Sequence, residues 1–168
     1  GRYARSAGSG CGLPSRSHKR RWTSFDTALI SIGQGDVLLS PLQAALYTAA
    51  IANGGTLWKA NLLKKVLNAG GSVLYSERPR ARGRLAASPE TLEKIRYGMF
   101  LSVNSDIGGS KRARNRAISL SGKTGTAEVG PRATRYKNTW FIGFGTHRSR
   151  TYAIAILVEH GASGGKTC

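Results

Sequence analysis

The stretch from residue 118 to residue 129 reads Ile-Ser-Leu-Ser-Gly-Lys-Thr-Gly-Thr-Ala-Glu-Val, and it decides the fold. It predicts an extended strand, and two further strand-like stretches follow at residues 138–145 and 151–159. Three consecutive strands joined by loops favour an antiparallel sheet. Two helical patterns precede them, so we expect an α/β fold in which helices cover an antiparallel sheet.

The two helices are predicted from their first and last residues. The first begins at Ser40-Pro41, where a hydroxyl cap precedes proline, and Asn53-Gly54-Gly55 ends it. The second begins at Ser88-Pro89 and ends near Asn104. The apolar residues expected to share one face are Leu42, Ala45, Leu46, Ala49 and Ala50 in the first helix and Leu92, Ile95, Met99 and Val103 in the second.

The remaining stretches are predicted to be less regular. Residues 62–67 and 72–76 are β-prone and flank an Asn-Ala-Gly-Gly turn, which predicts a small hairpin, and the Arg-rich residues 77–84 predict an exposed loop. Residues 1–26 are rich in Gly, Ser and Arg without periodicity, so we expect a loop or disordered lead-in there. The folded part is expected at residues 27–168.

The Lys-Thr-Gly-Thr core of the first strand brings a cation, two hydroxyls and a bare backbone together. Alternation along a strand predicts Lys123 and Gly125 on one face and Thr124 and Thr126 on the other. Gly125 has no side chain, so a ligand could approach the strand closely there. The chemistry is that of a groove for a carboxylate, and the backbone edge could pair with an extended peptide.

Lys-Thr-Gly is also a motif of penicillin-binding proteins and class A β-lactamases. The order of several other segments resembles the C-terminal part of the transpeptidase domain of class B penicillin-binding proteins, most closely the cell-elongation type, from about residue 11 onward. The matching segments are Ser31-Ile-Gly-Gln-Gly-Asp36, Ser40-Pro-Leu-Gln-Ala-Ala45, Ile51-Ala-Asn-Gly-Gly55 and Trp140-Phe-Ile-Gly-Phe144. The resemblance implies a penicillin-binding-protein/β-lactamase-like transpeptidase fold. It also implies peptidoglycan cross-linking by D,D-transpeptidation, with β-lactam binding, in the parent protein.

The resemblance also assigns roles to the strand. It implies that Lys123 raises the positive potential, that Thr124 and Thr126 hold the carboxylate of a peptidoglycan stem peptide or a β-lactam, and that Gly125 lies in the same substrate site. The Thr126 N–H would form half of an oxyanion hole. Lys123 and Thr126 are therefore the expected catalytic residues, and no cofactor is expected.

The nucleophile of the family is expected to be absent. In the family, Ser-x-x-Lys and Ser-x-Asn both precede the Gly-Gln-Gly segment. We expect no Ser-x-x-Lys anywhere in this chain, because Ser15 lies four residues before Lys19 and Ser17 lies two residues before it. Residues 102–104, Ser-Val-Asn, fit Ser-x-Asn but follow the segment, so we interpret them as coincidence. We expect residues 27–168 to be the C-terminal portion of a transpeptidase domain whose front portion, with the nucleophile, is absent. We expect that this chain is not catalytic alone.

Two other enzyme-like patterns carry less weight. Ser121 and Lys123 share a strand face and could form a Ser-Lys dyad, but nothing in the sequence shows the burial that a lysine base requires. The run from Gly161 to Thr167 resembles a phosphate loop, but it has three residues between its glycines where the Walker A pattern has four. We expect neither to function.

The charge balance supports an alternative function. The chain has 26 Lys and Arg against 8 Asp and Glu, a formal net charge of +18. Such a balance also fits a basic binding module for nucleic acid or an anionic cell-envelope polymer. The basic residues fall in separate clusters without a nucleic-acid motif, so no specific nucleic acid is expected.

Composition also bears on metals and location. Cys11 and Cys168 lack metal-site spacing, and His18, His147 and His160 are scattered, so we expect no metal site or disulfide framework. No run of eighteen apolar residues occurs, so the chain as given is expected to be soluble and to carry no anchor. By resemblance, the parent is expected at the periplasmic or extracytoplasmic face, anchored in the inner membrane.

Overall fold

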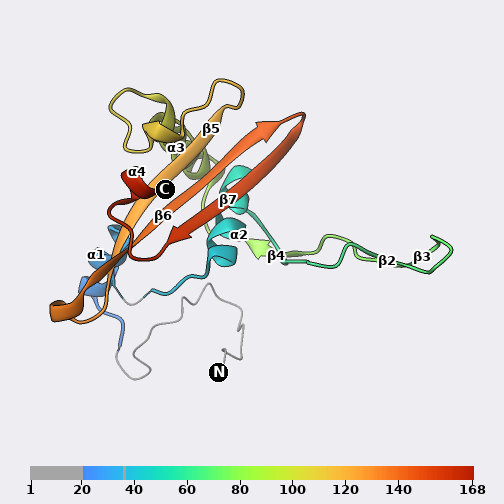
Figure 1. Ribbon diagram of the computed structural model, residues 1–168, viewed down its shortest axis with the longest axis horizontal. Helices are drawn as coiled ribbons and strands as arrows, with labels where there is room; N and C mark the ends of the chain where they lie inside the picture. Colours follow the sequence, from blue (N-terminus) through green and yellow to red (C-terminus); the bar gives the residue numbers. More distant parts are fainter. Residues whose placement is uncertain (1–20, 36) are drawn as a thin grey trace. The chain divides into compact units, whose positions relative to one another are not determined.

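The computed structural model describes residues 21–35 and 37–168 (Figure 1). The chain divides after Ser40 into two units, residues 1–40 and 41–168, and each is described by itself. Among the described residues, no helix is both long enough and apolar enough to cross a membrane.

The first unit contains helix α1 (Ser24–Ser31). The predicted lead-in at residues 1–26 is therefore wrong for residues 24–26, and residues 1–20 lie outside the described part of the chain. A capping box starts the helix: the Asp26 N–H donates to Thr23 Oγ1 at 3.3 Å, and the Thr23 N–H donates to Asp26 Oδ2 at 2.7 Å. These bonds satisfy N–H groups that the first turn leaves unpaired.

The second unit is built on a three-stranded antiparallel sheet in the order β5-β6-β7. The strands are β5 (Leu120–Val129), β6 (Tyr136–His147) and β7 (Arg150–Val158). They agree with the three predicted strands, and the predicted α/β class with an antiparallel sheet is confirmed. In this sheet β5 has a strand neighbour on one side only, so the backbone groups on its other edge do not pair with a strand of this sheet.

Both predicted helices are present, α2 (Pro41–Ala52) and α3 (Pro89–Asn104). Helix α2 contacts β6 and β7, and α3 contacts β5. The predicted apolar face of α3 is right for Leu92, Met99 and Val103, which are buried, but wrong for Ile95, which is 39% exposed.

The predicted face of α2 is right for Ala50, which is fully buried, and wrong for Leu42, which is 54% exposed. The other buried residues of the helix are Ala44, Thr48 and Ile51. These three buried positions recur at helical spacing, and two of them are small, which lets the helix backbone approach its neighbours closely. Since Ala44 and Ile51 are themselves apolar, apolar character alone does not select the buried face of α2, and the elements packed against the helix decide it.

Four short strands join α2 to α3. Strand β1 (Thr56–Trp58) pairs with β4 (Ala81–Arg84), and the predicted hairpin is confirmed as β2 (Lys65–Leu67) and β3 (Val73–Ser76). The hairpin projects from the rest of its unit, and all its strand residues are exposed (Figure 1). Since β4 lies within residues 77–84, the prediction of a loop there is wrong for its second half.

The remaining elements are short. The 3-10 helices η1 (Lys111–Ala113) and η2 (Arg132–Thr134) lie before and after β5, and the four-residue helix α4 (Gly164–Thr167) follows β7. Helix α4 contacts β5 and β6.

Candidate functional site

Strand β5 displays the Lys-Thr-Gly-Thr residues as the alternation predicted. Lys123 and Gly125 lie opposite Ile142 and Trp140 of β6, whereas Thr124 and Thr126 lie opposite the buried Phe141 and Thr139. Residues opposite each other in an antiparallel pair share a face, so the cation and the two hydroxyls belong to different faces. Lys123 is exposed, and its Nζ donates to the carbonyl oxygen of Thr124 at 2.5 Å.

The bare backbone at Gly125 is approached closely by the chain itself. A Cβ on Gly164 would lie 2.5 Å from the Gly125 carbonyl oxygen, so only a glycine fits against the strand there. A Cβ on Gly125 itself would meet nothing nearer than the Trp140 Cβ, at 3.6 Å. The first turn of α4 therefore covers the Gly125 backbone. A Cβ at Gly125 would make only an ordinary van der Waals contact.

The hydroxyl of Thr126 connects β5 to the same turn. Its Oγ1 accepts a hydrogen bond from the Gly164 N–H at 3.0 Å. This bond ties the far end of the motif to a residue 38 positions away in sequence. No local sequence pattern predicts this link.

The outer edge of β5 is bound by residues from the end of α3 and the loop after it. Asn104 Nδ2 donates to the Leu120 carbonyl at 2.9 Å, and the Thr124 N–H donates to Ser110 Oγ at 3.1 Å. The Ser102 hydroxyl donates to Ser110 Oγ at 2.9 Å. Residues 102–104, interpreted as a coincidental Ser-x-Asn, thus support the motif strand, and Ser110 had no sequence signal at all.

The structure does not favour the Ser-Lys dyad. Ser121 is only 8% exposed, but Lys123 is exposed and binds the Thr124 carbonyl. A lysine base needs desolvation to lose its proton near neutral pH. Lys123 therefore lacks the surroundings that this role requires.

One run after β7 does fit the letters Ser-x-x-Lys, at Ser163-Gly-Gly-Lys166, which corrects the expectation that this motif is absent. Ser163 is the N-cap residue of α4, but its side chain makes no capping bond. Lys166 is exposed, so it too lacks the desolvation of a lysine base. The run follows the Lys-Thr-Gly motif rather than preceding the Gly-Gln-Gly segment.

The phosphate-loop interpretation of the same run is also not favoured. Helix α4 begins within this run, at Gly164, but it has only four residues. The Thr167 hydroxyl accepts from the N–H groups of Ala162 and Ser163, at 3.1 and 3.4 Å. These N–H groups, which a phosphate would need, bind a side chain instead.

No metal centre is formed within residues 21–35 and 37–168, where no three His, Cys, Asp or Glu side chains gather. His160 stacks on the Tyr136 ring with a centroid separation of 4.2 Å, and Cys168 Sγ donates to Thr139 Oγ1 at 3.4 Å. Cys11 and His18 lie outside the described residues.

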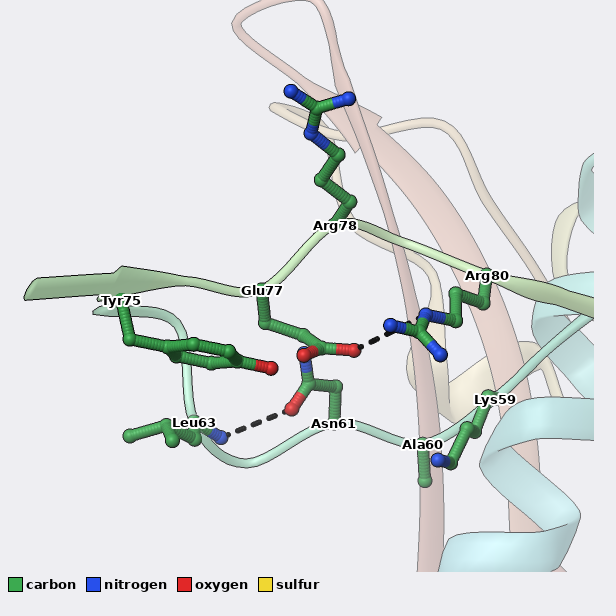
Figure 2. A pocket seen from close by; sticks show the side chains of 8 residues that line it. All are labelled: Lys59, Ala60, Asn61, Leu63, Tyr75, Glu77, Arg78 and Arg80. Atoms are coloured by element: carbon green, nitrogen blue, oxygen red, sulfur yellow. Dashed lines mark hydrogen bonds and ion pairs between the residues drawn. The ribbon is translucent and has the colours of Figure 1, made fainter. Parts of the chain in front are cut away.

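A pocket lies at the base of the β2–β3 hairpin, away from the motif strand in sequence (Figure 2). Basic side chains from Lys59, Arg78 and Arg80 line it, together with the carboxylate of Glu77. Arg80 Nε lies 3.7 Å from Glu77 Oε1. No residue of β5 contributes to this pocket, so it is distinct from the Lys-Thr-Gly site.

Comparison with known proteins shows similarity to one family over most of the chain. A profile of the family described as "Penicillin binding protein transpeptidase domain" matches residues 3–167. The chain is 33% identical to the peptidoglycan D,D-transpeptidase PbpA of Mycobacterium tuberculosis over 141 residues, 80% of this chain and 27% of that protein. It is 31% identical to the peptidoglycan D,D-transpeptidase MrdA of Acinetobacter baumannii over 165 residues, 89% of this chain and 24% of that protein.

Solved structures show the same likeness. The penicillin G acyl-enzyme complex of penicillin-binding protein A from M. tuberculosis matches 82% of this chain and 31% of its own with a TM-score of 0.65, at 33% identity. The chain spans about a quarter of the length of the curated relatives it matches.

Proposed function

The chain belongs to the penicillin-binding protein transpeptidase family, and from this premise we propose that β5 is the substrate-binding strand of a peptidoglycan D,D-transpeptidase of the cell-elongation type. The names of the relatives PbpA and MrdA support this reaction. The observation that carries the proposal is the display of Lys-Thr-Gly-Thr on an edge strand of the sheet, with an exposed lysine and a bare glycine on one face.

The roles proposed for this strand are those that the family resemblance implies. Lys123 supplies a positive field, and Thr124 and Thr126 supply hydroxyls for the carboxylate of a stem peptide or a β-lactam. The N–H groups of Thr124 and Thr126 point to the same side of the strand, because alternate residues of an antiparallel strand share that direction. The Thr126 N–H then serves as one donor to the oxyanion that forms during acyl transfer.

The nucleophile is proposed to come from a Ser-x-x-Lys segment that is not among these 168 residues. The run Ser163-Gly-Gly-Lys166 has an exposed lysine, so it is a poor candidate for that role. We therefore propose that this chain does not acylate by itself and completes its site with a front portion of the domain. We also propose that it acts in the cell envelope, at the extracytoplasmic face, because its relatives are named as peptidoglycan transpeptidases.

The test supplies a front portion that carries Ser-x-x-Lys and Ser-x-Asn, taken from a PbpA-type relative, joined to this chain. A labelled penicillin should then form a covalent adduct on the supplied serine, seen by fluorescence on a denaturing gel and by intact mass. The control is the same fusion with that serine replaced by alanine. A folded fusion that forms no adduct would contradict the proposed function.

The second candidate, a basic binding module, rests on the net charge of +18. Among the described residues, exposed basic side chains lie on the hairpin base, on η1 and at the β6–β7 turn. Since these belong to separate elements without a nucleic-acid-binding motif, we rank this candidate second.

A further inference from the structure

The outer edge of β5 is fixed at two points. Asn104 Nδ2 binds the Leu120 carbonyl at 2.9 Å, and Ser110 Oγ binds the Thr124 N–H at 3.1 Å. The two β5 residues are four apart, so both groups point away from β6. The end of α3 and its following loop thus support β5 on the side where it has no neighbouring strand, up to the middle of the Lys-Thr-Gly-Thr run.

Ser110 is itself held firmly. It is only 2% exposed, its N–H donates to the Ser102 carbonyl at 2.9 Å, and its Oγ accepts from the Ser102 hydroxyl, also at 2.9 Å. The loop can return to α3 only because residue 108 is glycine: a Cβ there would lie 2.2 Å from the Ser102 carbonyl oxygen. A polar side chain buried this deeply and bonded on several sides has a defined position.

We propose that Ser110 is a positioning residue of the transpeptidase site. Its hydroxyl holds the Thr124 N–H and so fixes the direction in which Thr126, two residues further on, presents its own N–H. Ser110 touches neither substrate nor reacting atoms, and acts through Thr124. This inference rests on the proposed function of β5, because it assigns a role within that same site.

The arrangement has two chemical consequences. An oxyanion donor is effective only when it lies within about 2.7–3.1 Å of the developing charge, so a small displacement of an edge strand weakens it. In addition, the Thr124 N–H already donates its hydrogen bond to Ser110 Oγ. An extended peptide or β-lactam that adds along this edge therefore pairs from Thr126 onward rather than from Thr124.

The first experiment uses this chain alone and does not depend on catalysis. Amide hydrogen exchange of Thr124 is followed by NMR in the wild type and in Ser110→Ala, Ser110→Cys and Ser110→Thr. Loss of one hydrogen bond of ordinary net strength should speed exchange at Thr124 by about tenfold. The Ser110→Ala and Ser110→Cys variants should show this faster exchange at Thr124. Ser110→Thr keeps the hydroxyl and should retain the slow exchange of the wild type.

The matched control is Ser88→Ala. Ser88 caps the other end of α3, where its Oγ accepts from the Thr91 N–H at 3.1 Å. Its removal weakens the same helix by the loss of one serine hydroxyl, but should leave exchange at Thr124 unchanged. If Ser88→Ala and Ser110→Ala raised Thr124 exchange equally, Ser110 would be merely structural.

The second experiment measures β-lactam acylation in the fusion with a supplied front portion. Ser110→Ala and Ser110→Cys should lower the acylation rate constant by about tenfold, since a misplaced oxyanion donor acts on the transition state. The pre-acylation dissociation constant should change little, and Ser110→Thr and Ser88→Ala should remain near the wild type.

The two experiments separate the possible failures. If the wild-type fusion forms no adduct while Thr124 exchange responds as expected, the proposed function is wrong and the link from Ser110 to β5 is real. If the fusion acylates and both Ser110→Ala and Ser110→Cys leave exchange and acylation at wild-type values, the positioning role is wrong.

Discussion

Replacement of Lys123 by alanine tests the site most directly, because it should separate function from stability. Lys123 is exposed, and its hydrogen bond to the Thr124 carbonyl is between adjacent residues. Surface substitutions of this kind usually change the free energy of unfolding by no more than about 0.5 kcal/mol. The thermal midpoint of the chain should therefore stay almost constant.

The functional effect is set by the lost charge. Two unit charges 4 Å apart attract by about 1 kcal/mol in water and by about 4 kcal/mol at the effective dielectric of a protein surface. Lys123→Ala should therefore slow β-lactam acylation of the fusion by between about fivefold and about a thousandfold. Lys123 is exposed in this chain, which favours the lower limit, and exclusion of water by the front portion of the fusion would raise the effect toward the upper limit.

The assay is the acylation rate of the fusion with a labelled penicillin, measured beside thermal unfolding. Lys137→Ala is the matched control, because Lys137 is an exposed lysine of the neighbouring strand, opposite Glu128, and its loss changes the net charge equally. Lys123→Arg keeps the charge and should retain much of the rate. Unchanged acylation in Lys123→Ala would refute the site assignment, and unfolding of the variant would show that Lys123 is structural.

Three further predictions concern the chain alone. It should form no covalent adduct with a labelled penicillin, because every lysine in residues 21–35 and 37–168 is exposed and none is a desolvated base for a serine; intact mass is the measurement, and an adduct mapped to Ser121 or Ser163 would revive one of the two Ser-Lys patterns. Binding to DNA or RNA should be weak, insensitive to sequence and steeply salt-dependent, as titrations at two ionic strengths will show; sequence-selective binding at physiological salt would favour the basic binding module. Gly164→Ala should destabilise the chain by about 1–3 kcal/mol, because its Cβ would overlap the Gly125 backbone. Chemical denaturation measures this, and a midpoint equal to that of the wild type would mean that α4 moves away from β5 at no cost.

The sequence predicted the helices and strands whose signals lie in neighbouring residues. Serine followed by proline marks the start of α2 and of α3, because both residues favour the first turn of a helix wherever it stands. Alternation along β5 correctly separated Lys123 from the two threonines, since strand geometry alone fixes that period. The order of motifs along the chain was sufficient to identify the family.

The tertiary structure decided what surrounds the motif. Ser110 binds the Thr124 N–H across 14 residues, and the Gly164 N–H binds Thr126 Oγ1 across 38 residues. Neither contact follows from a local pattern, because hydroxyls and glycines occur throughout this chain and only the folded path brings these particular ones to β5. The same reason explains the buried Thr48 on α2: the face that packs is chosen by the neighbours of the helix, and one sequence window does not contain them.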